Sequence, residues 1–185
     1  QYALSTPWDI SSGVSFTTYF NVGDQTSNAV ALQFSADGTK MYSAGYSSDY
    51  VTEWDLAKAF DLTDKVSTIG PEFNNLEGLT IDDSDNIVIV DKGDAEIVKL
   101  SQTGTVLLNV TGFTAPRDVA IDTSGNIYAT EANSGNVTKL DSTGTQVWSV
   151  GGNGTADGKF DEPSGIDVDA SGNVYIADSG NDRLQ

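Results

Sequence analysis

The chain has 185 residues, which is enough for one domain with a sizeable core. Its 27 acidic and 9 basic residues give a formal net charge of -18, and because nucleic acids and anionic lipids need a cationic surface, neither is expected as a partner. Cys and His are both absent, which excludes disulfides and any Ser–His–Asp or Cys–His site built from these residues, and no apolar run approaches the roughly 20 residues of a membrane span.

Four segments along the chain share one pattern, an alternating apolar strand, a polar turn and a second apolar strand. They read AVALQFSADGTKMYSAG from Ala29, LEGLTIDDSDNIVIVDKG from Leu76, PRDVAIDTSGNIYATEAN from Pro116 and PSGIDVDASGNVYIADSG from Pro163. Internal repetition decides architecture, so the pattern predicts a propeller whose inner strands line a central channel. These inner strands are expected at 29–34, 76–81, 116–121 and 163–168.

The turns of the four segments give the length of the repeat. Equivalent turn positions are Gly38, Asp85, Gly125 and Gly172, at intervals of 47, 40 and 47 residues. One four-stranded blade takes roughly 40–45 residues. Further strands at 96–100 and 105–110, repeated at 136–140 and 145–150, supply the third and fourth strands. The predicted fold class is therefore all-β, a β-propeller of about four four-stranded blades.

Both ends of the chain fall inside a predicted blade. The first residues align with a third strand, and the last residues begin one. We expect a single domain over 1–185, with blades at about 163–185 plus 1–25, 26–75, 76–115 and 116–162. One alternative is a closed four-bladed ring in which Tyr2 lies near Gln185. The other is a fragment of a six- or seven-bladed ring whose open blade edges pair with another copy, giving a homo-oligomer.

Two stretches resemble known repeats. Residues 76–185, most clearly PSGIDVDASGNVYIADSGNDRLQ, resemble NHL-repeat propellers in the proline-led inner strand, the Asp-x-Ser-Gly-Asn turn, the Tyr-Ile-Ala-Asp strand and the Asn-x-Arg start of the next strand. Residues 1–75, with YALSTPWDIS and FSADGTKMYSAG, resemble a related repeat of surface and secreted proteins. The resemblance implies a propeller and an extracellular or cell-surface location. It does not imply one activity, since a common fold hosts many functions.

Some propellers of this kind are enzymes. The amidating lyases of the class use His ligands for zinc, and this sequence has no His. Propeller lactonases and gluconolactonases hold calcium with Glu, Asn and Asp in the channel, and the nearest match is the set Asp91, Glu131 and Asp178 at the ends of second strands. No cofactor and no metal ligand set are predicted, with Ca²⁺ left as the alternative.

The sequence favours a non-catalytic binding scaffold of a secreted or surface protein, with a protein or glycan ligand. A calcium-dependent hydrolase of the lactonase type is the alternative. Loops on a rigid scaffold carry binding, so the predicted contacts are Tyr46, Asp91, Arg117, Glu131 and Asp178. The three acids have a second interpretation, in which each caps a loop of its own blade.

Two loop motifs have structural rather than catalytic interpretations. The Asp-x-Ser-Gly-Asn segments at 122–126 and 169–173 predict hydrogen-bonded hairpin turns, because they lack the further ligands of a calcium loop. The glycine-rich run at 151–161 lacks the Lys and Ser/Thr of a phosphate loop, and predicts a flexible connection between blades.

Overall fold

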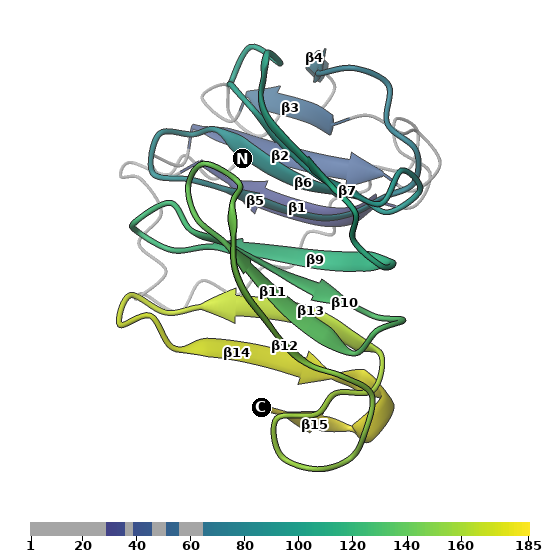
Figure 1. Ribbon diagram of the computed structural model, residues 1–185. Helices are drawn as coiled ribbons and strands as arrows, with labels where there is room; N and C mark the ends of the chain where they lie inside the picture. The colour runs from purple at the N-terminus through teal and green to yellow at the C-terminus, as the bar shows by residue number, and fades with distance from the viewer. Residues whose placement is uncertain (1–28, 36–38, 46–50, 56–64) are drawn as a thin grey trace, which may run out of the picture.

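The structure is a computed structural model that describes residues 29–35, 39–45, 51–55 and 65–185. In this part of the chain fifteen strands form four antiparallel sheets, which lie one after another along an arc (Figure 1). The only described helix is a single 3-10 turn over Ser179–Asn181, so no described helix is long and apolar enough to cross a membrane.

Each sheet follows chain order, as an up-and-down blade does. The first holds β1 (Ala29–Phe34), β2 (Lys40–Gly45), β3 (Val51–Asp55) and β4 (Lys65–Ile69). The second holds β5 (Leu76–Ile81), β6 (Ile87–Asp91), β7 (Glu96–Leu100) and β8 (Val106–Thr111). The third holds β9 (Pro116–Ile121), β10 (Ile127–Glu131), β11 (Asn136–Leu140) and β12 (Gln146–Gly151). The fourth holds β13 (Pro163–Val168), β14 (Val174–Asp178) and β15 (Arg183–Leu184).

The four inner strands are confirmed where the sequence predicts them. Strands β1, β5, β9 and β13 are neighbours in turn along the arc. Their alternating apolar residues point to the two faces of each sheet, and those faces pack against the preceding and following blades. The architecture is a partial β-propeller.

The core lies between blades rather than inside any one of them. Tyr42 and Val51 of the first blade pack with Leu79 and Ile89 of the second. The same kind of cluster joins the second blade to the third, and the third to the fourth. Trp148 packs against the third of these clusters, where it lies edge-on to Tyr128 with ring centroids 6.0 Å apart.

The hairpin turns between the first two strands of a blade are built by one carboxylate, as predicted. Asp122 Oδ1 accepts hydrogen bonds from the backbone amides of Ser124 and Asn126, both at 2.9 Å, and Oδ2 accepts one from the Asn126 side chain. Asp82 and Asp169 make the same set in their own turns. These carboxylates are therefore engaged in holding turns, which confirms the hairpin interpretation.

The 151–161 connection is hydrogen-bonded to the last described strand. The Arg183 guanidinium donates hydrogen bonds to the carbonyls of Thr155, Ala156 and Lys159, at 2.8, 2.9 and 2.7 Å. Phe160 is buried in the core between the third and fourth blades. The segment joins two blades, and Arg183 of β15 holds three of its carbonyls, while its flexibility stays a prediction.

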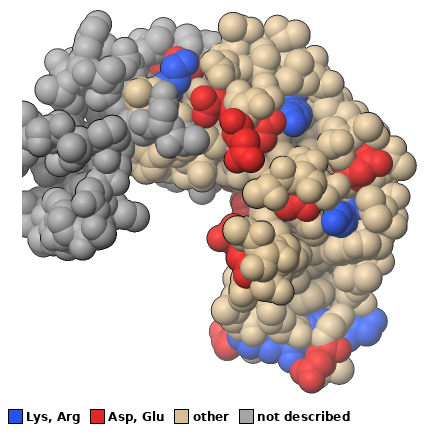
Figure 2. Space-filling view, turned by 90° about the vertical axis from the view of Figure 1, so that its left-hand side faces the viewer, with Lys and Arg blue, Asp and Glu red and all other residues tan. Residues whose placement is uncertain are grey.

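The predicted closed ring depends on residues 1–25, including Tyr2, which lie outside the described residues. Among the described strands, the first and fourth sheets stand at opposite ends of the arc (Figure 1). Figure 2 shows the hollow on the concave side of this arc, with acidic side chains along its edge. The described blades thus form part of a ring.

Candidate binding cavity

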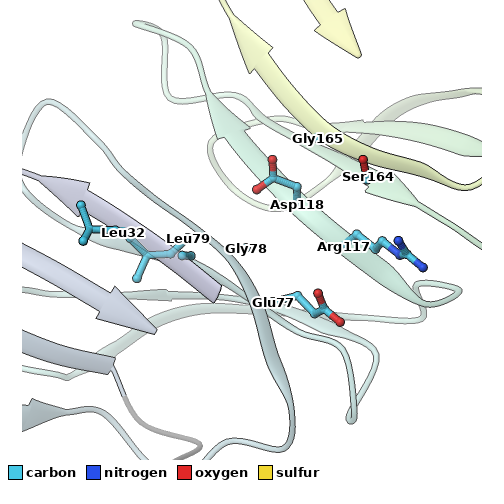
Figure 3. A pocket seen from close by; sticks show the side chains of 9 residues that line it. Leu32, Glu77, Gly78, Leu79, Arg117, Asp118, Ser164 and Gly165 are labelled. Atoms are coloured by element: carbon cyan, nitrogen blue, oxygen red, sulfur yellow. The ribbon is translucent and has the colours of Figure 1, made fainter. Parts of the chain in front are cut away.

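A cavity of about 400 Å³ opens where the four inner strands converge. It is lined by Ala31 and Leu32 of β1, Glu77, Gly78 and Leu79 of β5, Arg117 and Asp118 of β9, and Ser164 and Gly165 of β13. Figure 3 shows these side chains around the space between the strands. Its volume lies within the roughly 300–1,000 Å³ of small-molecule sites, but the cavity is open and its lining is mainly polar, whereas such sites are mostly apolar.

The cavity lies where the inner strands are bulged. The register against the second strand shifts between Leu76 and Leu79 in the second blade, and between Pro163 and Gly165 in the fourth. A bulge interrupts the ladder and re-aims side chains, and bulges are common beside functional sites. In the third blade the bulge amide of Asp118 donates to Thr130 Oγ1 at 3.1 Å, so a hydroxyl replaces the missing ladder partner.

Gly78 allows the second and third inner strands to approach closely. A Cβ at this position would lie 2.7 Å from the Asp118 Cα and 2.9 Å from the Arg117 carbonyl oxygen. Any larger residue would force β5 and β9 apart, because two of the three nearest atoms are backbone and the third, Asp118 Oδ1, lies at 2.6 Å. Because Gly78 has no side chain, β9 lies close to β5, and the Asp118 carboxylate lies beside Gly78 of the preceding blade.

Asp118 links the third blade to the fourth inside the cavity. Its Oδ2 accepts a hydrogen bond from the backbone amide of Ile166 at 3.0 Å. Burial raises the pKa of the Asp118 carboxyl, while the amides of Ile166 and Val119 act in the opposite direction. The cavity thus contains a carboxyl group that is partly withdrawn from water and oriented by a neighbouring strand.

Arg117 and Glu77 supply the other charges. The Arg117 Nε is buried and has no hydrogen-bond partner among the described residues, and one of its terminal nitrogens lies 4.0 Å from Glu162 Oε2. Glu77 pairs with Lys92 at 2.6 Å. Figure 3 shows Arg117 and Glu77 together on one side of the cavity and Leu32 and Leu79 on the other. The accessible terminal nitrogens of this guanidinium can bind an acceptor group of a ligand.

The five residues that the sequence predicts as ligand contacts lie in different parts of the molecule. Arg117 lines the cavity, and Tyr46 lies outside the described residues. The acids Asp91, Glu131 and Asp178 are buried at the ends of β6, β10 and β14. Each accepts a hydrogen bond from the backbone amide 17 residues earlier: Asn74 to Asp91 at 2.8 Å, Thr114 to Glu131 at 2.8 Å and Asp161 to Asp178 at 2.7 Å. These bonds agree with the loop-capping interpretation, and ligand contact by the three acids stays a prediction.

Asp178 is the most heavily bonded of these carboxylates. Besides Asp161, it accepts hydrogen bonds from Asn181, from Arg183 Nε at 2.7 Å and from Gln185 at 3.1 Å. Burial alone would raise the pKa of Asp178, but these donors outweigh it and lower the pKa to about 2. The Asn-x-Arg part of the repeat signature therefore forms one side of a carboxylate-centred network.

One group of carboxylates could hold a hard cation. Oxygens of Asp91, Asp94 and Glu96 lie within 4.8 Å of one another, the arrangement that calcium accepts. Asp91 already accepts the amides of Asn74 and Asp94, and burial raises the pKa of its carboxyl. In the fourth blade the corresponding cluster contains Asn181 and Arg183, so a protein cation lies beside the capping acid there.

Sequence reasoning missed Glu77, Asp118 and Ser164. The sequence predicts contacts in the loops, whereas the cavity is lined by residues at the second to fourth positions of the inner strands. The aligned segments do carry a signal. Their third residues are Ala31, Gly78, Asp118 and Gly165, so one carboxylate stands among small residues that leave space around it.

Comparisons with known proteins agree with this architecture. The family model of the NHL repeat matches residues 160–185, which confirms the resemblance seen in the fourth blade. A comparison with curated proteins finds no significant match.

Solved structures of several proteins share the fold. A streptogramin B lyase is similar with a TM-score of 0.69 and 17% identity over 86% of this chain and 51% of its own. A catalytically inactive virginiamycin B lyase from Staphylococcus aureus, in which Ala replaces a His, was solved with quinupristin and has a TM-score of 0.69 and 15% identity over 89% and 54%. The WD40 repeats of RRP9 give 0.64 and 15% over 85% and 50%. The chain spans about half the length of the structures it matches, and at these identities the likeness shows the fold alone.

Proposed function

We propose that this chain is a non-catalytic binding module of a secreted or cell-surface protein, and that a protein or glycan ligand is held at the cavity between the inner strands. The observation that carries the proposal is the convergence of Glu77, Arg117, Asp118 and Ser164 from three consecutive blades on one cavity of about 400 Å³. A binding site needs such oriented polar groups together with some apolar surface, which Leu32 and Leu79 supply.

The charges of the cavity suit a ligand that both donates and accepts hydrogen bonds. The Asp118 carboxylate can accept from a hydroxyl, amide or ammonium group. The terminal nitrogens of the Arg117 guanidinium, whose side chain is 34% exposed, can donate to a carbonyl, carboxylate or sugar oxygen. Peptide backbones and saccharides both have this mixture of groups.

The comparisons support a binding role in general terms. Similarity to WD40 repeats favours protein interaction. The lyase that is described as catalytically inactive has lost one His, and these 185 residues contain none, so that group has no counterpart here. Placement outside the cell belongs to the proposal and rests on the repeat resemblance.

Glycan and peptide arrays, followed by calorimetry on the best ligand, test the proposal. We expect Arg117→Ala and Asp118→Asn each to weaken binding by about tenfold or more, because each removes a charged hydrogen-bonding group from a partly desolvated site. Asp83→Asn is the matched control, since Asp83 is exposed on a turn outside the cavity. Unchanged affinity in both cavity variants of a folded protein would contradict the assignment.

A calcium-dependent hydrolase is the second candidate, and the observation in its favour is the presence of two carboxylates in the cavity, because carboxylate oxygens are the ligands that calcium takes. In this case Asp118 and Glu77 would be the cavity carboxylates available to a metal ion. Turnover of lactone and ester substrates in calcium, abolished by a chelator and by Asp118→Asn, would support it. A structure determined with calcium and showing a metal-free cavity would count against it.

A further inference from the structure

Asp118 is a carboxylate of the cavity that has no cation beside it among the described residues. Its carboxylate accepts the backbone amide of Ile166 at 3.0 Å, and the Val119 amide also stabilises the ionised form. Backbone amides supply partial charges only. An ionised carboxylate that is partly withdrawn from water is costly unless a cation is paired with it, because nothing else replaces its lost hydration. The surroundings of Asp118 therefore favour a positively charged ligand group.

The protein's own cations are engaged elsewhere, as far as the structure describes their side chains. Six of them each lie within 4.0 Å of a carboxylate other than that of Asp118: Lys40, Lys92, Lys99, Arg117, Lys139 and Arg183. Lys159 donates a hydrogen bond to the Gly151 carbonyl oxygen instead. Arg117 is next to Asp118 in the sequence, but side chains alternate along a strand, and Figure 3 shows the guanidinium and the carboxylate pointing in opposite directions.

The other charges near Asp118 do not offset its own. Burial is the main reason that the pKa of Asp118 is raised, and the Asp167 carboxylate on β13 raises it further by adding a second negative charge. Glu77 is paired with Lys92 at 2.6 Å, so these two residues supply no spare positive charge. Figure 2 shows acidic side chains along the edge of the hollow, and their field attracts cations to the concave side of the arc.

Glycines on the two neighbouring inner strands leave space on both sides of the Asp118 carboxylate. A Cβ at Gly78 of β5 would lie 2.6 Å from Oδ1, and a Cβ at Gly165 of β13 would lie 3.9 Å from Oδ2. Any larger residue at either position would therefore stand beside the carboxylate. Because both positions are glycine, a ligand group in the cavity has room to approach the oxygens.

Given that the cavity binds a ligand, as proposed for its function, we propose that Asp118 binds the ε-ammonium group of a lysine in a protein or peptide ligand. The mainly polar lining suits a charged group. Leu32 and Leu79 line the same cavity and can pack against the methylene stem of a lysine. The terminal nitrogens of Arg117 can donate to a carbonyl oxygen of the ligand backbone.

Two other cationic groups suit the site less well. A guanidinium pairs best with both oxygens of a carboxylate, and here Oδ2 already accepts the Ile166 amide, whereas an ammonium group needs one oxygen only. The ammonium group of an amino sugar lacks the apolar stem that Leu32 and Leu79 would cover. The cavity is therefore expected to prefer lysine to arginine and to glucosamine.

Titration of the 15N-labelled protein with Nα-acetyl-lysine N-methylamide, followed by NMR, tests the proposal, because the ε-ammonium is the only charge of this probe. A chelator in every sample removes metal ions that could compete for Asp118. We expect chemical-shift changes at the amides of Gly78 and Ile166. The same probe acetylated on its ε-nitrogen should bind at least about tenfold more weakly, because it has lost a charge-assisted hydrogen bond.

Two variants that change the net charge equally separate local pairing from the overall field. Asp118→Asn should weaken binding of the lysine probe by at least about tenfold and abolish the preference for the free ammonium group. Asp83→Asn, on an exposed turn outside the cavity, should leave binding within about twofold. Circular dichroism checks that both variants fold, and the comparison of the two probes on the wild-type protein does not depend on either variant.

Several results would overturn the lysine proposal. These are equal binding of the two probes by the wild-type protein, no binding of the lysine probe at up to roughly 50 mM, shift changes away from the cavity, and tighter binding of arginine derivatives or glucosamine. The binding function of the cavity would still stand if a neutral ligand from the arrays lost affinity in Asp118→Asn. That function would fail as well only if Arg117→Ala and Asp118→Asn left every ligand unaffected.

Discussion

The Asp178 carboxylate connects three separate parts of the fourth blade. It accepts hydrogen bonds from the backbone of Asp161 and from the side chains of Asn181, Arg183 and Gln185, and Arg183 in turn holds the carbonyls of the 151–161 connection. Its side chain is fully buried, so these bonds replace the water that an ionised group would otherwise require. The residue therefore stabilises a whole loop rather than a single turn.

Replacing Asp178 by Asn should destabilise the protein by about 2–4 kcal/mol, because Arg183 and the Asp161 amide lose a charged acceptor in a buried position. Chemical denaturation followed by tryptophan fluorescence measures the change. Asp157→Asn is the control, since the exposed Asp157 lies 4.0 Å from Arg183 and should contribute less than about 0.5 kcal/mol. A similar loss in both variants would show that the network is not the cause.

Lowering the pH should weaken the hydrogen-bond network around Asp178, because its carboxylate becomes protonated. The pKa of Asp178 is about 2 in the folded protein, below the ordinary value of 3.8, so its stabilising contribution is present above about pH 4 and is lost as the pH falls toward 2. The lowered pKa values of Asp82 and Asp122 act in the same direction. The raised pKa of Asp118 acts in the opposite direction, since its burial favours the protonated form.

We therefore expect the free energy of unfolding to fall between pH 4 and pH 2, and to fall less steeply in Asp178→Asn. Urea unfolding at a series of pH values provides the slopes. Equal slopes in the two proteins would assign the acid sensitivity to other carboxylates.

At the scale of the elements, the inner strands determine both the packing of the blades and the shape of the cavity. Gly78 and Gly165 occupy the same position in β5 and β13, yet their surroundings differ. An added Cβ at Gly78 would meet the Asp118 backbone at 2.7 Å, whereas at Gly165 it would lie 3.5 Å from the Ala177 Cβ, an ordinary contact.

Gly78→Ala should destabilise the chain by about 2 kcal/mol or more, because β5 and β9 must separate and the cavity must widen. Gly165→Ala should be tolerated within about 0.5 kcal/mol, and the first blade already has Ala31 at this position. Thermal unfolding of both variants compares them directly. If Gly165→Ala were the more damaging, the close approach of β5 and β9 would not be the controlling feature.

The inner strands could be predicted from the sequence because their signals are local. Alternating apolar residues and turn residues such as Asp122, Gly125 and Asn126 lie within a few residues of each other, and the structure places all four inner strands at the predicted bounds. The NHL resemblance at the fourth blade rests on the same kind of local signal.

The cavity could not be predicted in the same way, because its residues meet only across blades. Asp118 is a candidate ligand-binding residue for two reasons. Gly78 of the preceding blade leaves space beside it, and the Ile166 amide of the following blade orients its carboxylate. Neither relation has a local signature. Arg117 was predicted as a contact, but as part of a loop surface rather than as a cavity residue beside Asp118.

For the whole molecule, the net charge of -18 sets the response to salt. Repulsion among carboxylates opposes the compact state, and ions screen it. We expect the melting temperature to rise by about 3–5 °C between low salt and 0.5 M sodium chloride. Differential scanning calorimetry measures the shift, and a melting temperature independent of salt would contradict the expectation.

The effect of calcium on the melting temperature, measured at high salt, tests whether the protein binds a metal ion. In 0.5 M sodium chloride, millimolar calcium should add no further increase, since the proposed binding module requires no metal. A further rise that Asp94→Asn removes would instead show that the cluster of Asp91, Asp94 and Glu96 binds calcium outside the cavity lining. It would contradict the expectation of a metal-free module without supporting the hydrolase, whose metal would lie at Asp118 and Glu77.

The regular spacing of the capping acids also bears on how the chain acquires its fold. Asp91, Glu131 and Asp178 each bond to an amide only 17 residues upstream, and the strand ladders join consecutive strands. Contacts between blades involve successive blades of the arc. Such short sequence separations favour rapid folding for a β protein, with each finished blade serving as a template for the next. During synthesis the second and third blades, which are described in full, can therefore form in order from the ribosome.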